Sequence, residues 1–341
     1  MRKIFFGLLV IFLIASCKSD EKKVGGTQLG DLEVIRFEDE LMGLDTTDVE
    51  GQFHEWEKKY PAFTEVFFQN VFPVEPGGNF YNGLRAFSRD TTMTAFYDLV
   101  KKEFGDFSEE TKALNEAFEN ALKWFPMAKK PRIYTYISAF AMQRFIFADT
   151  DKDGIAIGLD MFLGDRFDYT ILETGDNNFS RYLTRTYDKQ HLVKKVIESW
   201  IEDQMGLQQG DRAIDYMLYN GKKLYLLKQI LPEVQDSVLM EYTGSQVEYL
   251  DKYQKEMWAF YLEEQLFYTT DNYKIKRLVF PAPNSTALQM PPGTPGQTGN
   301  YLGLKIVESF MKRNPEISTE QLLSMDAQNL LEQSKFKPSN R

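Results

Sequence analysis

The chain has little with which to build a covalent or metal-based site. Its 341 residues include one cysteine, Cys17, and two histidines, His54 and His191, which lie far apart in the sequence. A single cysteine cannot form an intramolecular disulfide, and two distant histidines cannot supply a three-histidine zinc centre. The sequence also has no Gly-x-Ser-x-Gly elbow, no P-loop and no dinucleotide fingerprint. No motif therefore identifies a hydrolase, a nucleotide-binding enzyme or a dehydrogenase.

Positive charge is scarce too. Lys and Arg together number 40 against 50 Asp and Glu, which gives a formal net charge of −10. Nucleic acids and anionic lipid surfaces select basic faces, so we predict no nucleic-acid partner and no electrostatic docking on a membrane. Long apolar runs are equally rare. The longest, over residues 4–15, falls short of the about 20 residues that span a membrane.

The short apolar run fits a lipoprotein signal peptide. Arg2 and Lys3 precede it, and Leu-Ile-Ala-Ser before Cys17 is the small-residue pattern at which lipoprotein signal peptidase cleaves. We predict that residues 1–16 are the signal peptide. Cys17 would then carry diacylglycerol on its thiol and a third acyl chain, such as palmitate, on its amine. The alternative is an ordinary signal peptide with a chance cysteine.

Lipidation at Cys17 would restrict the chemistry of the mature chain. It uses the single thiol, so disulfides, thiolate metal sites, iron–sulfur clusters and cysteine nucleophiles are excluded, and we predict no cofactor besides the covalent lipid. Cleavage also removes two basic residues and takes the formal net charge from −10 to −12. The mature chain would be anchored to a membrane by its acyl chains and not embedded in it.

Composition divides the mature chain into a tether and a folded part. Residues 17–30 comprise the lipidated cysteine and a polar, glycine-rich tether, and residues 31–341 are expected to form a single α+β domain. Lys18 is not the aspartate associated with inner-membrane retention, so we expect the outer membrane, facing the periplasm. Ser19-Asp20-Glu21 resembles an export signal for the cell surface, which is the alternative location.

Hydrophobic periodicity predicts a mainly helical α+β fold with a small sheet in the first half. Strands are expected over residues 32–37, 132–138, 144–148 and 154–164. Helices are expected over residues 53–69 with an interruption at Pro61, and over 108–124, 188–205, 212–219, 222–230, 245–267, 301–313 and two short stretches after 318. Asn220-Gly221 separates two of these helices, and a capping box at Ser245 opens another.

An acidic segment matches part of the calcium loop of an EF-hand. Asp149, Asp151 and Asp153 alternate before Gly154, and Asp160 takes the twelfth position, where an EF-hand has glutamate. The flanking segments have the pattern of strands, whereas an EF-hand needs helices. We therefore favour a polar β-hairpin turn, with a calcium-stabilised binding module as the alternative.

A proline- and glycine-rich loop over residues 281–299 is the candidate for a partner-binding surface. Proline and glycine fix the shape of a loop, and exposed loops on rigid scaffolds commonly bind partners. The candidate residues are Pro292, Gly293, Pro295, Gly296, Gly299 and Tyr301. The alternative is a loop that packs over the domain and closes a groove.

Three segments together resemble one family. They are residues 157–164 (Ile-Gly-Leu-Asp-Met-Phe-Leu-Gly), residues 292–303 (Pro-Gly-Thr-Pro-Gly-Gln-Thr-Gly-Asn-Tyr-Leu-Gly) and residues 332–338 (Glu-Gln-Ser-Lys-Phe-Lys-Pro). With the cysteine motif and the early Val-Ile-Arg-Phe, they resemble the GldB family of gliding-motility lipoproteins over nearly the whole mature chain. The resemblance implies an envelope lipoprotein that supports gliding through machinery linked to type IX secretion. Its partners would be the membrane, through the lipid anchor, and other gliding-machinery or envelope proteins.

The same architecture resembles a class of predicted zinc metallopeptidases, in which His-Glu-x-x-His lies on the helix after the Gly-Leu-Asp strand. Here Glu198 takes the glutamate position, and Ile197 and Ile201 take both histidine positions. Isoleucine cannot ligate zinc. The resemblance therefore implies a degenerate, metal-free zincin-like fold and a non-catalytic interaction component.

Carboxylates leave one enzymatic alternative open, a carboxylate-dependent envelope hydrolase. Its first candidate residues are Glu198, Glu202 and Asp160. Because Glu198 lies beside an apolar helix face, burial is expected to raise its pKa, as a general acid requires.

Overall fold

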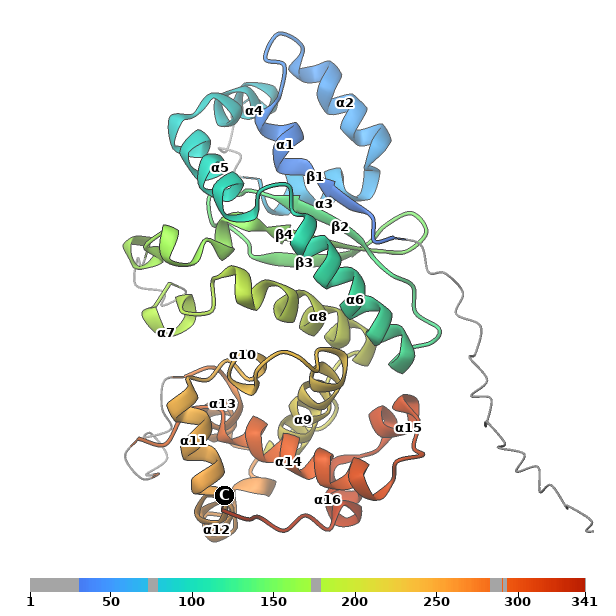
Figure 1. Ribbon diagram of the computed structural model, residues 1–341, viewed down its shortest axis with the longest axis vertical. Helices are drawn as coiled ribbons and strands as arrows, with labels where there is room; N and C mark the ends of the chain where they lie inside the picture. Colours follow the sequence, from blue (N-terminus) through green and yellow to red (C-terminus); the bar gives the residue numbers. More distant parts are fainter. Residues whose placement is uncertain (1–30, 73–78, 173–178, 283–289, 291–292, 341) are drawn as a thin grey trace, which may run out of the picture. The chain divides into compact units, whose positions relative to one another are not determined.

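The computed structural model describes residues 31–72, 79–172, 179–282, 290 and 293–340 (Figure 1). The predicted signal peptide, Cys17, the tether and Pro292 lie outside the described residues. The mainly helical α+β class with a small sheet in the first half is confirmed. Among the described residues, no helix has the length and hydropathy needed to cross a membrane.

A mixed four-stranded sheet lies in the first half of the chain. Its strands are β1 (Val34–Arg36), β2 (Arg132–Tyr136), β3 (Arg144–Ala148) and β4 (Asp153–Gly158), in the order β1-β2-β4-β3. β2 pairs in parallel with β1 and β4, whereas β3 is antiparallel to β4. β3 has its predicted bounds. The first strand is shorter than predicted because Phe37 begins a helix, and the last ends at Gly158, where a 3-10 turn follows.

Helices α1 to α6 connect β1 to β2. They are α1 (Phe37–Met42), α2 (Val49–Lys59), α3 (Pro61–Asn70), α4 (Phe80–Arg89), α5 (Thr91–Phe104) and α6 (Ser108–Trp124). The predicted break at Pro61 and the predicted bounds of α6 are confirmed, whereas α1, α4 and α5 were not predicted. On one sheet face, the ring of Phe63 from α3 stacks on Tyr134 of β2, with ring centroids 4.4 Å apart.

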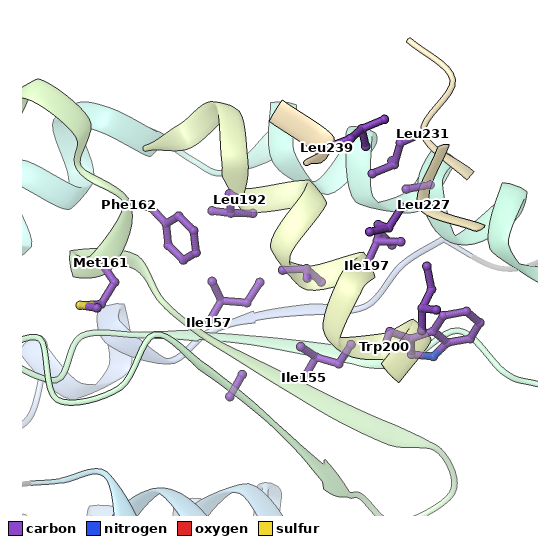
Figure 2. Close-up of a cluster of buried hydrophobic side chains, with 14 of the residues drawn as sticks. Ile155, Ile157, Met161, Phe162, Leu192, Ile197, Trp200, Leu227, Leu231 and Leu239 are labelled. Carbon is purple, nitrogen blue, oxygen red and sulfur yellow. The ribbon is translucent and has the colours of Figure 1, made fainter. Parts of the chain in front are cut away.

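The opposite sheet face is covered by a long helix from the second half of the chain, α8 (Lys189–Met205). Because side chains alternate along a strand, Ile155 and Ile157 point away from the Tyr134 side. Figure 2 shows both isoleucines beside Leu192 and Ile197 of α8. The sheet is thus buried on both faces, as parallel strands require.

The remaining elements are short 3-10 turns and helices. The turns are η1 (Leu159–Phe162), η2 (Gly164–Arg166), η3 (Tyr169–Leu172) and η4 (Leu266–Tyr268). The helices are α7 (Arg181–Thr184), α9 (Ala213–Ile230), α10 (Asp236–Leu239), α11 (Gly244–Lys252), α12 (Gln254–Glu263), α13 (Asn272–Val279), α14 (Thr298–Arg313), α15 (Thr319–Ser324) and α16 (Ala327–Ser334).

The predicted break at Asn220-Gly221 is wrong, because α9 runs through both residues without interruption. Gly221 serves a helix crossing. A Cβ at Gly221 would lie 2.4 Å from the carbonyl carbon of Gly303 on α14, and a Cβ at Gly303 would lie 2.0 Å from the carbonyl oxygen of Met217. Paired glycines therefore let the backbones of α9 and α14 approach more closely than any side chain permits.

Two further helix boundaries differ from the predictions. The capping box opens on Thr243 with Gln246, two residues before the predicted Ser245, and the long predicted helix divides into α11 and α12 at Tyr253. The capping box at Ser318 with Gln321 is confirmed. Ser and Thr are both preferred N-cap residues, so a segment that holds both does not determine from the sequence where its helix begins.

We expect Gly303→Ala to lower the free energy of unfolding by about 2–3 kcal/mol, because the new methyl group meets backbone that cannot move aside. The matched control is Gly83→Ala in α4, where a Cβ would meet nothing within 4 Å. The control should be neutral or more stable by up to about 1 kcal/mol, since alanine favours helix. Denaturant unfolding measures the stability of both variants. If the two were equally stable, the close backbone contact of α9 and α14 at Gly303 would be contradicted.

Candidate functional site

Helix α8 has two buried faces of opposite character. Leu192, Val196, Ile197, Trp200 and Ile201 are all fully buried, at the i, i+3, i+4 spacing that predicted this helix. Figure 2 shows part of this face between β4 and the side chains of Leu227, Leu231 and Leu239. The other face carries lysines and glutamates, and these form a buried ion cluster with α9 and with the segment after α10.

Glu198 lies at the centre of this ion cluster. Its Oε2 accepts from Lys194 Nζ at 2.7 Å, and its Oε1 lies 3.1 Å from Lys223 Nζ on α9. Lys223 also pairs with Glu202 at 2.6 Å. Both carboxylate oxygens of Glu198 are therefore held by lysines, and its side chain is only 14 % exposed.

Glu241, which follows α10, completes the ion cluster. Its Oε1 accepts from Lys194 at 2.9 Å and from Lys195 at 2.7 Å. Its backbone carbonyl accepts a hydrogen bond from Arg185. One carboxylate from a distant segment thus joins two neighbouring lysines of α8, which would otherwise repel each other.

Lysine charges within the ion cluster hold Glu198 and Glu241 ionised. Burial alone would raise the pKa of Glu198, but the charges of Lys194 and Lys223 outweigh burial and hold that pKa well below its ordinary value. Burial also opposes ionisation of Glu241, yet Lys194 and Lys195 lower its pKa to about 2. The expectation that burial raises the pKa of Glu198 is therefore wrong, because two lysine partners, one of them Lys223 on another helix, outweigh burial.

The histidine positions of the zinc motif lie in the apolar core. Ile197 and Ile201 are both fully buried, and both belong to the apolar face of α8. The actual histidines lie elsewhere. His54 is half-exposed on α2, and His191 pairs with Asp188 at the start of α8 with an Nδ1–Oδ1 distance of 2.8 Å. In the part of the chain that the structure describes, no three His, Cys, Asp or Glu residues are placed to hold a metal ion.

A pocket of about 420 Å³ opens beside the ion cluster. Lys194, Lys195, Glu198, Glu202, Lys223 and Glu241 all line it. Gln143 and Arg144 at the start of β3 form another part of the wall, and Asn300 and Tyr301 of α14 a third. The candidate site therefore combines α8, the edge strand of the sheet, α9 and α14.

Asp160, the third carboxylate proposed for a hydrolase, lies outside this pocket. It is fully buried in η1, where its Oδ2 accepts from the backbone N–H groups of Ser138 at 3.0 Å and Phe140 at 2.8 Å. Burial raises its pKa to about 6 in spite of these bonds. Asp160 thus ties the turn after β2 to the end of β4, and it is not brought together with Glu198 and Glu202.

Residues 149–152 of the acidic segment form the turn of the hairpin that joins β3 to β4, as favoured from the sequence. Asp149 accepts from Arg132 at 2.6 Å and from Tyr134 at 2.9 Å. Asp151 is exposed in the turn and Asp153 begins β4, whereas Asp160 lies beyond the other end of that strand, about 20 Å away at strand rise. The four carboxylates therefore do not converge as the calcium alternative requires.

The described part of the proline- and glycine-rich loop is largely buried. Pro295, Gly296, Gly299 and Tyr301 are buried, and Gly293 is exposed with φ +85°. The carbonyl oxygen of Gly296 accepts from Tyr242 at 2.9 Å, and the Tyr301 hydroxyl donates to Asp251 at 2.6 Å. The alternative of a packed, groove-closing loop fits the four buried residues. A partner-binding role stays a prediction that rests on Gly293.

Sequence reasoning missed most of the site. Lys194 and Glu198 stand four residues apart on one helix, a spacing that predicts an ion pair and could have been noticed. Arg144, Lys223 and Glu241 lie 25 to 54 residues from Glu198, and nothing local marks them as neighbours.

Comparison with known proteins places the chain. The family model described as "Gliding motility protein GldB" matches residues 18–338, nearly the whole length. The chain belongs to the GldB family. No curated protein and no solved structure matches it significantly. Membership in the GldB family implies a role in gliding motility, and the lipoprotein designation of the GldB family model indicates the cell envelope.

We expect acid to destabilise the fold through Glu241. Its folded-state pKa of about 2 lies below its ordinary 4.5, so its ionised form stabilises the fold above pH 4.5, and that stability is lost as the pH falls toward 2. The loss corresponds to about 3 kcal/mol. Denaturant unfolding across this range measures it. Glu241→Gln should flatten the pH dependence, whereas the exposed control Glu263→Gln should follow the parent chain. An unchanged slope in Glu241→Gln would refute the assignment.

Proposed function

We propose that this chain is a lipid-anchored, non-catalytic interaction component of the gliding machinery, held at the outer membrane on the periplasmic side. The observation that carries the non-catalytic part is the state of Glu198. Both its oxygens pair with lysines, and the residues in the two histidine positions beside it are buried isoleucines.

A general base needs a free lone pair and a pKa near the working pH. Glu198 keeps lone pairs, since each of its oxygens pairs with one lysine, but Lys194 and Lys223 hold its pKa far below neutrality, so it does not meet the second need. Zinc ligation needs nitrogen, sulfur or oxygen atoms, which Ile197 and Ile201 lack. The resemblance to zinc metallopeptidases therefore stays a prediction about a shared fold, and it gives no reason to expect zinc-dependent hydrolysis by this chain.

The anchoring part of the proposal rests on the N-terminal sequence and the family. Cys17 lies where a lipoprotein signal peptidase would leave it as the first residue, and the family model begins at the next residue. The formal net charge of −10 disfavours electrostatic attraction to an anionic membrane surface, so charge is not expected to replace the anchor. Linkage to type IX secretion follows from the family resemblance alone and is part of this proposal.

Replacing the carboxylate of Glu198 should leave gliding intact. We expect a Glu198→Gln chain to restore motility to a gliding strain that lacks the gene, provided it reaches normal abundance. Asp203→Asn, on the same helix and exposed outside the pocket, is the matched control. Purified parent protein should also hold far less than one zinc per chain by metal analysis. Lost gliding in a stably folded Glu198→Gln chain, or stoichiometric zinc, would overturn the non-catalytic proposal.

The anchor has a separate test. Cys17→Ala should abolish incorporation of labelled palmitate and, because lipoprotein signal peptidase cleaves before that cysteine, should leave residues 1–16 attached. Ser16→Ala is the control, because it keeps a small residue before the cysteine and should leave lipidation unchanged. Equal palmitate labelling of Cys17→Ala and the parent chain would show that Cys17 is not the lipidation site.

A further inference from the structure

The pocket beside the ion cluster has a charge that is unusual for this chain. Four cations line it, Arg144, Lys194, Lys195 and Lys223, against the three carboxylates Glu198, Glu202 and Glu241. The whole chain has a formal net charge of −10, yet this pocket carries one surplus positive charge. A fixed surplus charge in a walled pocket attracts a ligand of the opposite sign.

The surplus charge resides on Arg144. Each lysine of the pocket pairs with a carboxylate, whereas Arg144 pairs with none among the described residues. Its Nε donates to Ser199 Oγ at 2.5 Å, and its Nη1 donates to Gln143 Oε1 at 2.6 Å. These two neutral partners fix the plane of the guanidinium and leave its charge unneutralised by any ion pair.

Gln143 supplies a second observation that points to a ligand. Its Oε1 is held by Arg144, so its Nε2 is fixed in the opposite position of the amide, and this buried nitrogen has no hydrogen-bond partner within the described part of the chain. Buried donors almost always have an acceptor. Gln143 and Arg144 are adjacent in the chain and both line the pocket, so a single oxygen-rich group would satisfy the donor and neutralise the cation.

We propose that this pocket binds a monoanionic carboxylate through Arg144 and Gln143. The planar guanidinium matches the two oxygens of a carboxylate, and one surplus charge matches one negative charge. Tyr187, Tyr216, Tyr219, Tyr242 and Tyr301 also line the pocket. Tyr187, Tyr216 and Tyr219 are half-buried and offer aromatic surface for the body of the ligand, whereas Tyr242 and Tyr301 are buried. The carboxylate belongs either to a small organic acid or to the C-terminus of a peptide chain, and this assignment does not depend on the proposed role in gliding.

The probes are N-acetyl-phenylalanine and the peptide acetyl-Ala-Ala-Ala-Phe, each compared with its C-terminal amide, and inorganic phosphate. Titration calorimetry and NMR on the lipid-free mature chain measure binding at millimolar concentrations. We expect at least one free carboxylate to bind and its amide not to bind. Tighter binding of the peptide assigns a chain terminus, and tighter binding of the amino acid assigns a small acid. Failure of both carboxylates, equal binding of the amides, or preference for phosphate would overturn the proposal.

Variants of the two pocket residues complete the test. Arg144→Gln should weaken binding at least tenfold, and Gln143→Leu should weaken it by a smaller factor. The control Arg85→Gln alters an exposed arginine of α4 outside the pocket and should bind as the parent does. Melting curves establish that each variant is folded, and Gln143→Leu keeps the test decisive if Arg144→Gln does not fold. Unchanged binding in folded Arg144→Gln, or in folded Gln143→Leu if it alone folds, would overturn the proposal. Binding is measured on the purified chain and does not depend on gliding, so the carboxylate proposal and the proposed role in gliding can fail independently of each other.

Discussion

The ion cluster on α8 is the constraint on which the rest of the fold depends. α8 buries five large apolar side chains on one face and charged side chains on the other. A buried carboxylate such as Glu198 is tolerated only where cations neutralise it, so Lys194, Lys223 and the segment that holds Glu241 must all come to α8. The sheet, α9 and the segment after α10 are therefore fixed around one helix by two different forces.

The glycine crossing of α9 and α14 delivers the other walls of the pocket. Lys223 follows Gly221 by two residues, and Asn300 precedes Gly303 by three. Close approach of the two backbones brings Asn220 within hydrogen-bond distance of Asn300, with an Nδ2–Oδ1 distance of 2.8 Å. The same approach sets Lys223 and Tyr301 on one pocket. A crossing that permits no side chain at its centre thus determines where a lysine and a tyrosine stand.

The sequence could predict features that depend on neighbouring residues, but not features that depend on residues far away in the chain. Periodicity and caps are local, and they located α6, β3, α8 and the break at Pro61. The role of Gly221 is distant, because the same Asn-Gly that ends a helix on local evidence serves a crossing with residues about 80 positions away. The prediction of a raised pKa for Glu198 was wrong for the same reason. An amphipathic pattern reveals burial, but it does not reveal a lysine on another helix, such as Lys223.

The site is suited to recognition more than to proton transfer. Proton transfer needs a group that changes charge near neutral pH, whereas Glu198 and Glu241 have lowered pKa values because their lysine partners favour the ionised form. Groups that keep the same charge near neutral pH cannot take up or release protons in a reaction, but they present a constant electrostatic potential to a ligand. Arg144 adds a cation whose position is set by Ser199 and Gln143 and whose charge no carboxylate of the ion cluster pairs with. The charged face of α8, with Glu198 held between two lysines, thus forms one wall of the pocket.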